Sequence, residues 1–159
     1  MITRFRNSAK AIIVEDGRML FNKLASGKLE DPCDYFYMLP GGGQHPGEAL
    51  PDALRRECLE ELGALVEIGS LVLARDYIGA HHEFAGSDSG FHQVEMMFRC
   101  TLRSPIDYSK ATDLDGGQCE SVWIPIAELA RWNIFPAALK TAFDAAGNVV
   151  VPVYLGDVN

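Results

Sequence analysis

The sequence contains few cysteines, and they are not spaced as a metal site or a disulfide framework would require. Its four cysteines, Cys33, Cys58, Cys100 and Cys119, lie far apart and include no C-x-x-C pair. This spacing fits neither a zinc site nor the dense disulfide pattern of a small secreted domain. The four histidines form no H-x-x-x-H motif, which also argues against zinc. We therefore expect free thiols in a cytoplasmic protein.

Long apolar runs and an excess of positive charge are also missing. The stretch MITRFRNSAKAIIV contains no uninterrupted apolar segment of the signal-peptide type, and no run approaches membrane-spanning length. Lys and Arg number 14 against 22 Asp and Glu, so the formal net charge is −8. An acidic chain lacks the basic surface that binds nucleic acid backbones, and it repels anionic membranes. Neither duplex nucleic acid nor a membrane is an expected partner, and an anionic substrate would need a cation as mediator.

The composition is that of an ordinary globular protein. Hydrophobic residues make up 48% and charged residues 23% of the 159 residues. This length is sufficient to bury a core, and we expect a single domain over residues 1–159. No internal repeat, low-complexity tract or linker interrupts it.

Periodicity and turn signals predict a mixture of strands and helices. Strands are expected at 9–14 and 19–24 around an Asp16-Gly17 hairpin turn, in YFYMLP, over 64–79 with a break at Gly69-Ser70, over 92–102, in CESVWIP, and at an edge in NVVVPVYL. Helices are expected from Pro51 to about Leu62 with a cap at Gly63, in IAELARW and in PAALKTAFDAAG. Loops are expected at SGKLEDPCD, the triple glycine, GAHHEFAGSDSG and KATDLDGGQ. The loop GAHHEFAGSDSG is expected to be mobile and to contact substrate. This order predicts an α+β fold, a layered α/β/α sandwich with a mixed sheet.

Three glutamates are crowded on the helix that follows the triple glycine. In PGGGQHPGEALPDALRRECLEELGA, residues 40–64, Glu57, Glu60 and Glu61 occupy helical positions i, i+3 and i+4. Like charges at this spacing destabilise a helix unless solvent or a cation relieves them. Hard cations such as Mg²⁺ prefer such oxygen ligands and are usually bound together with substrate phosphates. Taken alone, an acidic helix face is more often solvated surface; beside a glycine loop it suggests metal-assisted attack on a phosphoryl group.

The joint spacing of these residues resembles the signature of the Nudix hydrolases. That signature is glycine, five residues, Glu, seven residues, Arg-Glu, an apolar residue, any residue, Glu-Glu, any residue, Gly and an apolar residue. The matching positions here are Gly42, Glu48, Arg56-Glu57, Cys58, Glu60-Glu61, Gly63 and Ala64. The seven fixed positions all match, and the two apolar positions hold unusually small residues. The motif spans 23 residues, and the flanking strand order extends the resemblance to the whole domain.

The resemblance implies which residues would hold a metal ion. Glu57, Glu60 and Glu61 would be ligands of Mg²⁺ or Mn²⁺, and the carbonyl oxygen of Gly41 would be a further ligand. Glu57 is also a candidate catalytic residue that orients or deprotonates water, because one carboxylate can serve both tasks in a metal site.

Other motif positions would support this site structurally. Arg56 would pair with Glu48 and hold the helix against its loop, with Gly42 and Gly63 as supporting glycines. From helical spacing alone, Arg56 can also reach Asp52 or Glu60.

Members of this family commonly use one further acidic residue from a later loop as a metal ligand or general base. Glu120 is our first candidate for this catalytic role, before Glu83 and Glu95, and each can equally be an ordinary exposed carboxylate. Glu83 and Lys23 are also candidate substrate-binding residues. Lys23 closes a predicted strand at which members of the family often carry a basic side chain for substrate phosphates. The aromatic residues of YFYMLP could stack on a nucleobase.

The function implied is a metal-dependent pyrophosphohydrolase. It would cleave the diphosphate linkage of a nucleoside diphosphate joined to another moiety, a substrate of the nucleotide or nucleotide-sugar type. The sequence carries none of the subfamily marks for ADP-ribose, diadenosine polyphosphate or NADH, and a modified nucleoside triphosphate remains open. Two alternatives stay open as well, a non-catalytic nucleotide sensor and a diphosphate isomerase on the same fold. A homodimer is compatible with the resemblance, although no interface can be identified.

Overall fold

The computed structural model describes residues 1–25, 35–112 and 118–159. The strands are β1 (Arg4–Glu15), β2 (Arg18–Ala25), β3 (Tyr35–Met38), β4 (Gly41–Gly43), β5 (Val66–Ile78), β6 (Phe91–Leu102), β7 (Gln118–Pro125), β8 (Ile134–Phe135) and β9 (Tyr154–Asp157). The α-helices are α1 (Leu50–Leu62) and α2 (Ala85–Asp88), and the 3₁₀ helices are η1 (Gly79–His81), η2 (Ile126–Arg131) and η3 (Ala137–Thr141). The predicted loop at 26–34 with Cys33, the loop residues 113–117 and the side chain of Cys119 lie outside this description. Cys58 and Cys100 are buried free thiols.

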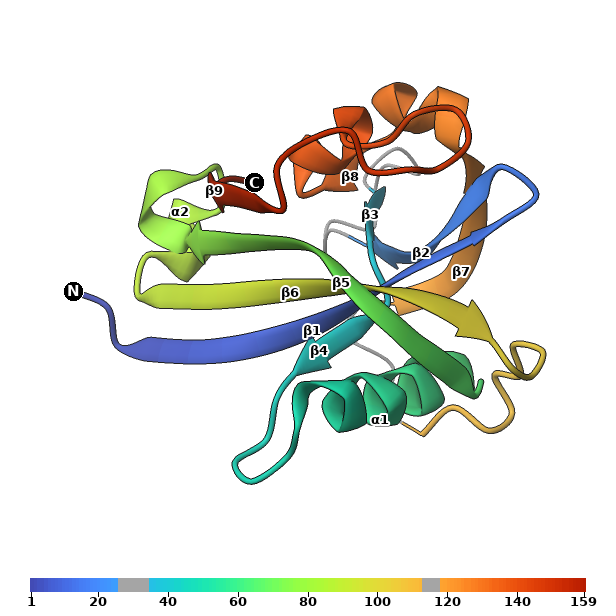
Figure 1. Ribbon diagram of the computed structural model, residues 1–159. Coiled ribbons are helices and arrows are strands. Elements are labelled where there is room, and N and C mark those ends of the chain that lie inside the picture. The colour runs from blue at the N-terminus through green and yellow to red at the C-terminus, as the bar shows by residue number, and fades with distance from the viewer. Residues whose placement is uncertain (26–34, 113–117) are drawn as a thin grey trace.

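A mixed sheet with few helices forms the molecule, as predicted for an α+β fold (Figure 1). The strand order is β8-β3-β2-β1-β6-β5-β9, with β4 also paired to β1 and β7 also paired to β2. Strand β1 runs parallel to β6 and antiparallel to β4. It pairs with β2 only next to their turn, at Val14↔Met19 and Glu15↔Arg18. Strand β1 therefore joins the two halves of the sheet.

The hairpin turn between β1 and β2 is confirmed at the predicted residues. Asp16 and Gly17 have φ angles of 47° and 71°. Two successive positive φ values define the type I′ geometry that matches the twist of paired strands, which explains the preference for Asp-Gly here.

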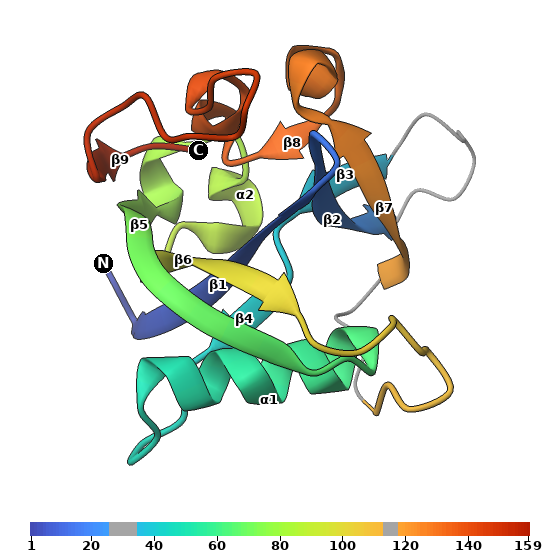
Figure 2. The ribbon, with the colours of Figure 1, turned by 45° about the vertical axis from the view of Figure 1, so that its right-hand side comes forward.

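Side chains alternate along β1 between two hydrophobic clusters. Ala9, Ala11 and Ile13 are fully buried against α1, whereas Ile12 is buried in the cluster on the opposite face. Figure 2 shows α1 beneath the sheet and the 3₁₀ segments and C-terminal region above it. Both faces are thus covered, the second by short 3₁₀ helices rather than by α-helices.

Helix α1 forms where it was predicted, for identifiable local reasons. Pro51 lies in its first turn and Asp52 favours the positive end of the helix dipole. The predicted stripe Leu54, Cys58 and Leu62 is fully buried against the sheet, which stabilises the fold by about 1.5–3 kcal/mol for each leucine. Gly63 ends the helix in the left-handed conformation at φ 59°, with its N–H donating to the Leu59 carbonyl at 3.0 Å.

Several short elements differ from the sequence-based expectation. The triple glycine, expected as a loop, is strand β4, because its backbone pairs with β1 at Ser8, Ala9 and Lys10. The expected loop at 79–90 contains η1 and α2. The two expected C-terminal helices are the shorter η2 and η3. Strand β8 was not predicted, and the edge strand expected at 148–155 is β9, which starts after Pro152 and pairs in parallel with β5.

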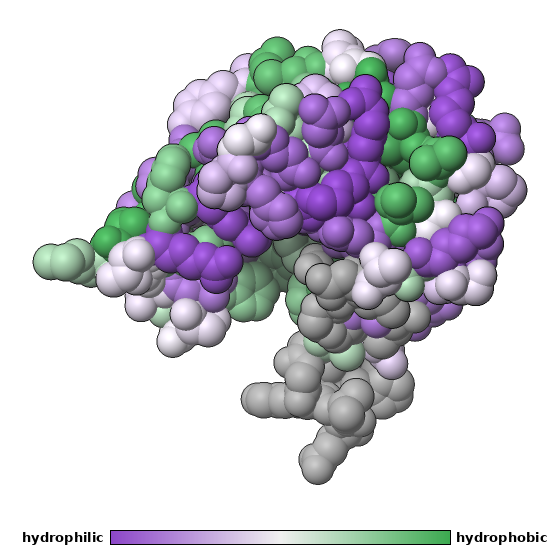
Figure 3. All heavy atoms as spheres, turned by 90° about the horizontal axis from the view of Figure 1, so that it is seen from below, coloured by the Kyte–Doolittle hydropathy of each residue, from purple (hydrophilic) through white to green (hydrophobic). Residues whose placement is uncertain are grey.

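The outer face beside α1 is mainly hydrophilic, with a few hydrophobic patches (Figure 3). Among the described residues, no helix is long and apolar enough to cross a membrane.

Candidate active site

Arg56 joins the carboxylates of α1 to the segment that precedes the helix. Its guanidinium donates to Glu48 at 2.9 and 3.1 Å, and to Glu57 and Glu60 at 2.9 Å each. A further bond of 2.9 Å goes to the carbonyl oxygen of Gly43. The hydrogen bond from Arg56, followed by the one from the His45 backbone N–H, lowers the pKa of Glu48 to about 2. The structure thus contains the predicted pairs of Arg56 with Glu48 and Glu60, while Asp52 pairs with Arg55 instead.

Gly42 leaves the space that the Glu57 carboxylate occupies. A Cβ atom at this position would lie 2.6 Å from the Glu57 carboxyl group. Because no side chain intervenes, carboxylates from α1 reach past β4 into a polar cavity of about 260 Å³. We call this cavity the carboxylate pocket. Its lining residues are Arg6, Lys10, Met38, Gly42, Gly43, His45, Arg56, Glu57, Glu60, Gln93 and Glu95.

Glu61 is placed differently from Glu57 and Glu60. It is 1% exposed and does not line the carboxylate pocket. Its Oε2 atom accepts hydrogen bonds from the Gly41 N–H at 2.8 Å and from Asn22 at 2.9 Å. The carbonyl oxygen of Gly41, the expected backbone ligand, accepts a short hydrogen bond from the Lys10 ammonium. The structure therefore brings two of the three glutamates into one pocket and uses the third to hold Gly41.

The donor set of the carboxylate pocket fits a divalent ion that is bound together with phosphate. Among the described residues, no three His, Cys, Asp or Glu side chains are grouped so that they could hold a metal ion by themselves. The pocket nevertheless presents Glu57 and Glu60, and Mg²⁺ is usually bound by one or two carboxylates, several waters and substrate phosphates. Its three cationic side chains balance its three carboxylates in a protein of net charge −8: Arg6, Lys10 and Arg56 against Glu57, Glu60 and Glu95.

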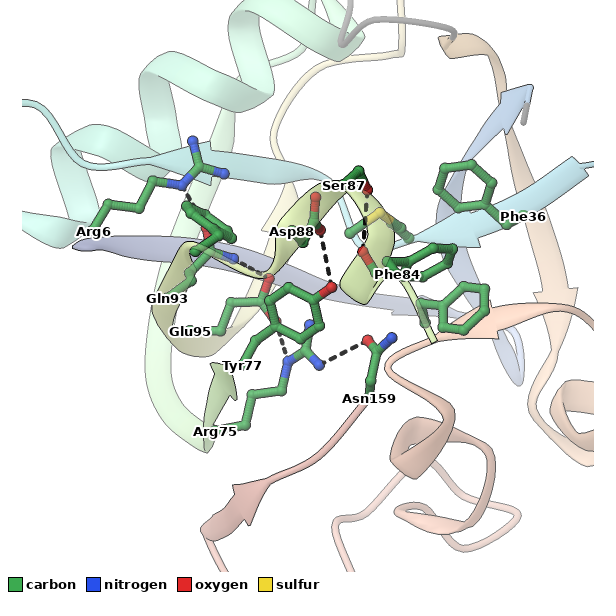
Figure 4. Close-up of a pocket in the computed structure, with 13 residues that line it drawn as sticks. Arg6, Phe36, Arg75, Tyr77, Phe84, Ser87, Asp88, Gln93, Glu95 and Asn159 are labelled. Atoms are coloured by element: carbon green, nitrogen blue, oxygen red, sulfur yellow. Dashed lines mark hydrogen bonds and ion pairs between the residues drawn. The ribbon is translucent and has the colours of Figure 1, made fainter. Parts of the chain in front are cut away.

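A second cavity, of about 300 Å³, adjoins the first and is walled by aromatic rings (Figure 4). We call it the aromatic pocket. Its aromatic lining residues are Phe36, Tyr77, Phe84, Phe91 and Phe135. Phe84 and Phe135 pack edge to face, with centroids 5.1 Å apart. The two pockets share four lining residues, Arg6, Met38, Gln93 and Glu95, so they lie side by side.

A chain of polar side chains forms the common floor of the two pockets. Arg6 donates to Gln93 at 2.5 Å, Gln93 donates to Glu95 at 2.8 Å, and Arg75 donates to Glu95 at 2.5 Å. Burial by itself would raise the pKa of Glu95, but the nearby charge of Arg75, together with Lys10 and Arg6, lowers the pKa below its usual value. Glu95 is therefore a buried, ionised carboxylate that orients cations. The alternative interpretation of Glu95 as an ordinary exposed carboxylate is therefore excluded.

Residues near the end of the chain close one side of the aromatic pocket. Asp157 on β9 is held by His81 at 2.6 Å and by His82 at 2.7 Å. Burial opposes ionisation of Asp157, yet the bonds from His82 and His81 lower its pKa to about 2. These contacts hold Asn159 beside Arg75, with 3.1 Å between Asn159 Oδ1 and the guanidinium. His81 is exposed and His82 is partly buried, and both thus support a pocket wall through Asp157.

The remaining candidates lie outside both pockets. Lys23 and Glu120 form an ion pair with a distance of 2.9 Å, in which Glu120 is about half exposed. The Lys23 ammonium also lies 4.2 Å from the centroid of the Tyr35 ring. Glu83 is exposed and lines neither pocket. The structure therefore does not bring Glu120, Lys23 or Glu83 to the glutamates of α1, and their roles stay predictions.

The sequence analysis did not single out three cations of the pocket floor, Arg6, Lys10 and Arg75. Lys10 and Arg75 are 6% and 2% exposed. A signal was available, because Lys10 lies inside the apolar run AKAIIV and Arg75 inside LVLARDYI. A charge within a buried strand requires a partner, which indicates a polar site.

Comparisons with known proteins identify the family. Residues 4–143 match the NUDIX domain, so the chain belongs to this family, as its motif predicted. Nucleoside triphosphatase NudI of Enterobacter sp. (strain 638) is 34% identical over 99 residues, which cover 61% of this chain and 69% of the relative. NudI of Escherichia fergusonii is 26% identical over 140 residues, covering 87% and 94%. A NUDIX hydrolase from Nitrosomonas europaea has the same fold, with a TM-score of 0.63, 22% identity and coverage of 81% and 78%.

Proposed function

We propose that this Nudix hydrolase cleaves the diphosphate linkage of a nucleoside diphosphate joined to another moiety, with Mg²⁺ or Mn²⁺ as cofactor. The observation that carries the proposal is that the carboxylate pocket adjoins the aromatic pocket. Aromatic walls suit a planar base, and carboxylates beside a glycine strand suit a metal-bound diphosphate.

Each part of the carboxylate pocket has a role in this proposal. Glu57 and Glu60 would hold the metal ion from the pocket side. Glu61 is buried and would support the site by accepting the hydrogen bond from the Gly41 N–H. The bound ion would supply a water of lowered pKa and neutralise negative charge on the phosphates. Arg56 keeps Glu57 and Glu60 close together despite their like charges. Glu57 is the candidate that orients or deprotonates the attacking water.

Two classes of compound are candidates for the substrate, and they differ in the second moiety. A nucleoside triphosphate is a nucleoside diphosphate joined to phosphate, so it falls within the proposed class. The names of the two NudI relatives favour this candidate, and nucleotide sugars are the other candidates.

Three residues outside the pockets have proposed roles as well. Glu120 is the candidate additional base, and Lys23 and Glu83 are candidate substrate contacts. Since Lys23 and Glu120 bind one another, each would have to exchange this partner for substrate or metal. If Glu120→Gln retains full turnover, Glu120 is not the base.

A substrate panel with identification of both products tests the function. Nucleoside triphosphates and nucleotide sugars are incubated with Mg²⁺ or Mn²⁺, and the products are separated by chromatography and weighed by mass spectrometry. Hydrolysis releases a nucleoside monophosphate and a second phosphorylated product, one of which carries an oxygen from labelled water. Consumption without release would indicate an isomerase, and binding without turnover would indicate a sensor.

Matched variants of α1 test whether turnover depends on the carboxylates of this pocket. Glu60→Gln removes a pocket carboxylate and should lower kcat by orders of magnitude without unfolding the protein. Asp52→Asn makes the same charge change on the same helix, at a side chain that is 65% exposed and lines neither pocket, and should retain activity. Equal activity of the two variants would contradict the proposed site.

A further inference from the structure

Arg6 lies where three cavities of the molecule meet. It lines the carboxylate pocket, the aromatic pocket and a third, more open hollow of about 390 Å³. Figure 4 shows Arg6 at one end of the aromatic pocket, with Phe36 and Phe84 toward the other end. A ligand that occupied both main pockets would therefore lie next to Arg6.

The surroundings of Arg6 hold its guanidinium in a defined orientation. Its Nε atom donates to Gln93 at 2.5 Å, and Gln93 is fixed in turn by Glu95. Its Cζ atom lies 5.2 Å from the centroid of the Phe91 ring, within the range of a cation–π contact. Its Nη1 atom lies beside β4, because a Cβ atom on Gly43 would be only 3.0 Å away. One end of the guanidinium thus faces the strand next to Glu57, and its flank faces the aromatic pocket.

The connectivity of a nucleotide matches this arrangement. Its base is separated by the sugar from the sugar-bound phosphate, which is the first of the two phosphates of the cleaved diphosphate. With the base in the aromatic pocket and the second phosphate of the cleaved linkage beside Glu57 and Glu60, the sugar-bound phosphate falls at the boundary where Arg6 lies. A guanidinium binds phosphate with two parallel hydrogen bonds, so it recognises this group by geometry as well as by charge.

We propose that Arg6 binds the sugar-linked phosphate of the substrate and thereby positions the diphosphate over Glu57 and Glu60. This inference rests on the proposed function, which it deepens by assigning the phosphate contact to one side chain. It follows that the protein distinguishes a nucleotide from the corresponding nucleoside mainly through Arg6.

Arg4 provides a closely matched control on the same strand. Its guanidinium lies 5.3 Å from the centroid of the same Phe91 ring, almost the same distance as that of Arg6. Arg4 lines the third hollow but neither main pocket. Arg4→Gln therefore removes the same charge and the same kind of ring contact without altering the boundary between the pockets.

The test measures binding of a nucleoside monophosphate without metal, so that it does not depend on turnover. Calorimetric titrations compare AMP, GMP, CMP and UMP with the corresponding nucleosides for the wild type, Arg6→Gln, Arg6→Lys and Arg4→Gln. Arg6→Gln should weaken monophosphate binding by about 10- to 100-fold, the range for a lost hydrogen bond to a charged group, and leave nucleoside binding unchanged. The monophosphate affinity of Arg6→Lys should lie between those of the wild type and Arg6→Gln. Lysine keeps the charge but lacks the planar group that donates two parallel hydrogen bonds. Arg4→Gln should behave as the wild type.

Several results would overturn the role of Arg6. These are unchanged monophosphate binding in Arg6→Gln, an equal loss for nucleoside and monophosphate, an equal loss in Arg4→Gln, or no monophosphate binding by the wild type. Should Arg6→Gln fail to fold, the comparison of Arg6→Lys with Arg4→Gln decides the question by the same criteria. Failure of the proposed function is separate, because it would appear as an absence of turnover in the substrate panel, whatever these titrations show.

Discussion

The carboxylate pocket and the aromatic pocket differ in chemistry although they share a floor. The first is lined by three cations, three carboxylates and two glycines, and the second chiefly by aromatic rings. Water and ions belong in the first, whereas a planar apolar group belongs in the second. Under the proposed function, bond cleavage and base recognition occupy separate regions, which meet at Arg6, Gln93 and Glu95. Changes in one pocket should therefore affect turnover, and changes in the other should affect substrate affinity.

The largest effect is expected from a methyl group added at Gly42. Gly42→Ala places a carbon 2.6 Å from the Glu57 carboxyl group and forces that group out of position. A misplacement of about 1 Å can lower the rate about 100-fold, so we expect at least this loss in kcat with Mg²⁺. Nucleoside monophosphate binding in the aromatic pocket should be unchanged. Gly86→Ala, whose Cβ atom would meet nothing within 4 Å, is the control; equal kinetics for the two variants would refute the steric argument.

A large loss of stability, rather than of specific activity, is expected at the end of α1. Gly63→Ala forces a side chain into the left-handed region and places its Cβ atom 1.9 Å from the Asp107 carbonyl oxygen. Together these should lower the free energy of unfolding by at least about 2 kcal/mol, measured by chemical denaturation. Gly17→Ala has the same backbone strain but no neighbouring atom within 4 Å, so its loss should be smaller. The reverse order would show that the packing around Gly63 is not the cause.

A moderate effect, confined to affinity, is expected in the aromatic pocket. Phe84 is 38% exposed, so its removal should be tolerated by the fold. Loss of a ring that stacks on a base should raise KM about 10-fold and leave kcat nearly unchanged. The control is Phe5→Ala, because Phe5 is 61% exposed and lines neither main pocket. If Phe84→Ala instead lowers kcat at unchanged KM, the division of roles between the pockets is wrong.

The smallest effect is expected in the acid range, at Glu48. The pKa of Glu48 is about 2 in the folded protein, against an ordinary value of 4.5. The unfolded chain therefore binds its proton first, and the stabilisation by Glu48 is lost as the pH falls from about 4.5 to 2. Denaturation at several pH values should show a shallower loss for Glu48→Gln than for the wild type. Asp107→Asn, which removes another carboxyl with a pKa of about 2, should also flatten the profile. An unchanged slope in both variants would contradict the assigned pKa values.

The carboxylate pocket could be predicted from sequence to the extent that it is local. Glu48, Arg56, Glu57 and Glu60 lie within 13 residues. Helical spacing, with a proline in the first turn and a glycine cap, fixes the relative positions of the last three, and Glu48 directly precedes the helix cap. The direction of Glu61 was not predictable in this way. It depends on Asn22 and Gly41, whose positions are set by the pairing of β2 with β3 and β7 and of β4 with β1.

The aromatic pocket could not be predicted, because its lining residues are spread along the chain from Arg6 to Asn159. Strands β8 and β9 have two and four residues, too few for a periodic signal. The floor depends on register, which places Arg6 opposite Gln93 on β6 and Gln93 opposite Tyr77 on β5. Such pairings are decided by the packing of the whole sheet.

The most direct test of the account is whether the carboxylates of α1 hold a divalent ion. Binding of Mn²⁺ in the presence of a non-hydrolysable nucleotide analogue can be titrated by electron paramagnetic resonance for the wild type, Glu57→Gln and Asp52→Asn. We predict saturable binding by the wild type and by Asp52→Asn, and an affinity at least about 10-fold weaker for Glu57→Gln. Equal Mn²⁺ affinity in all three proteins would contradict the central claim.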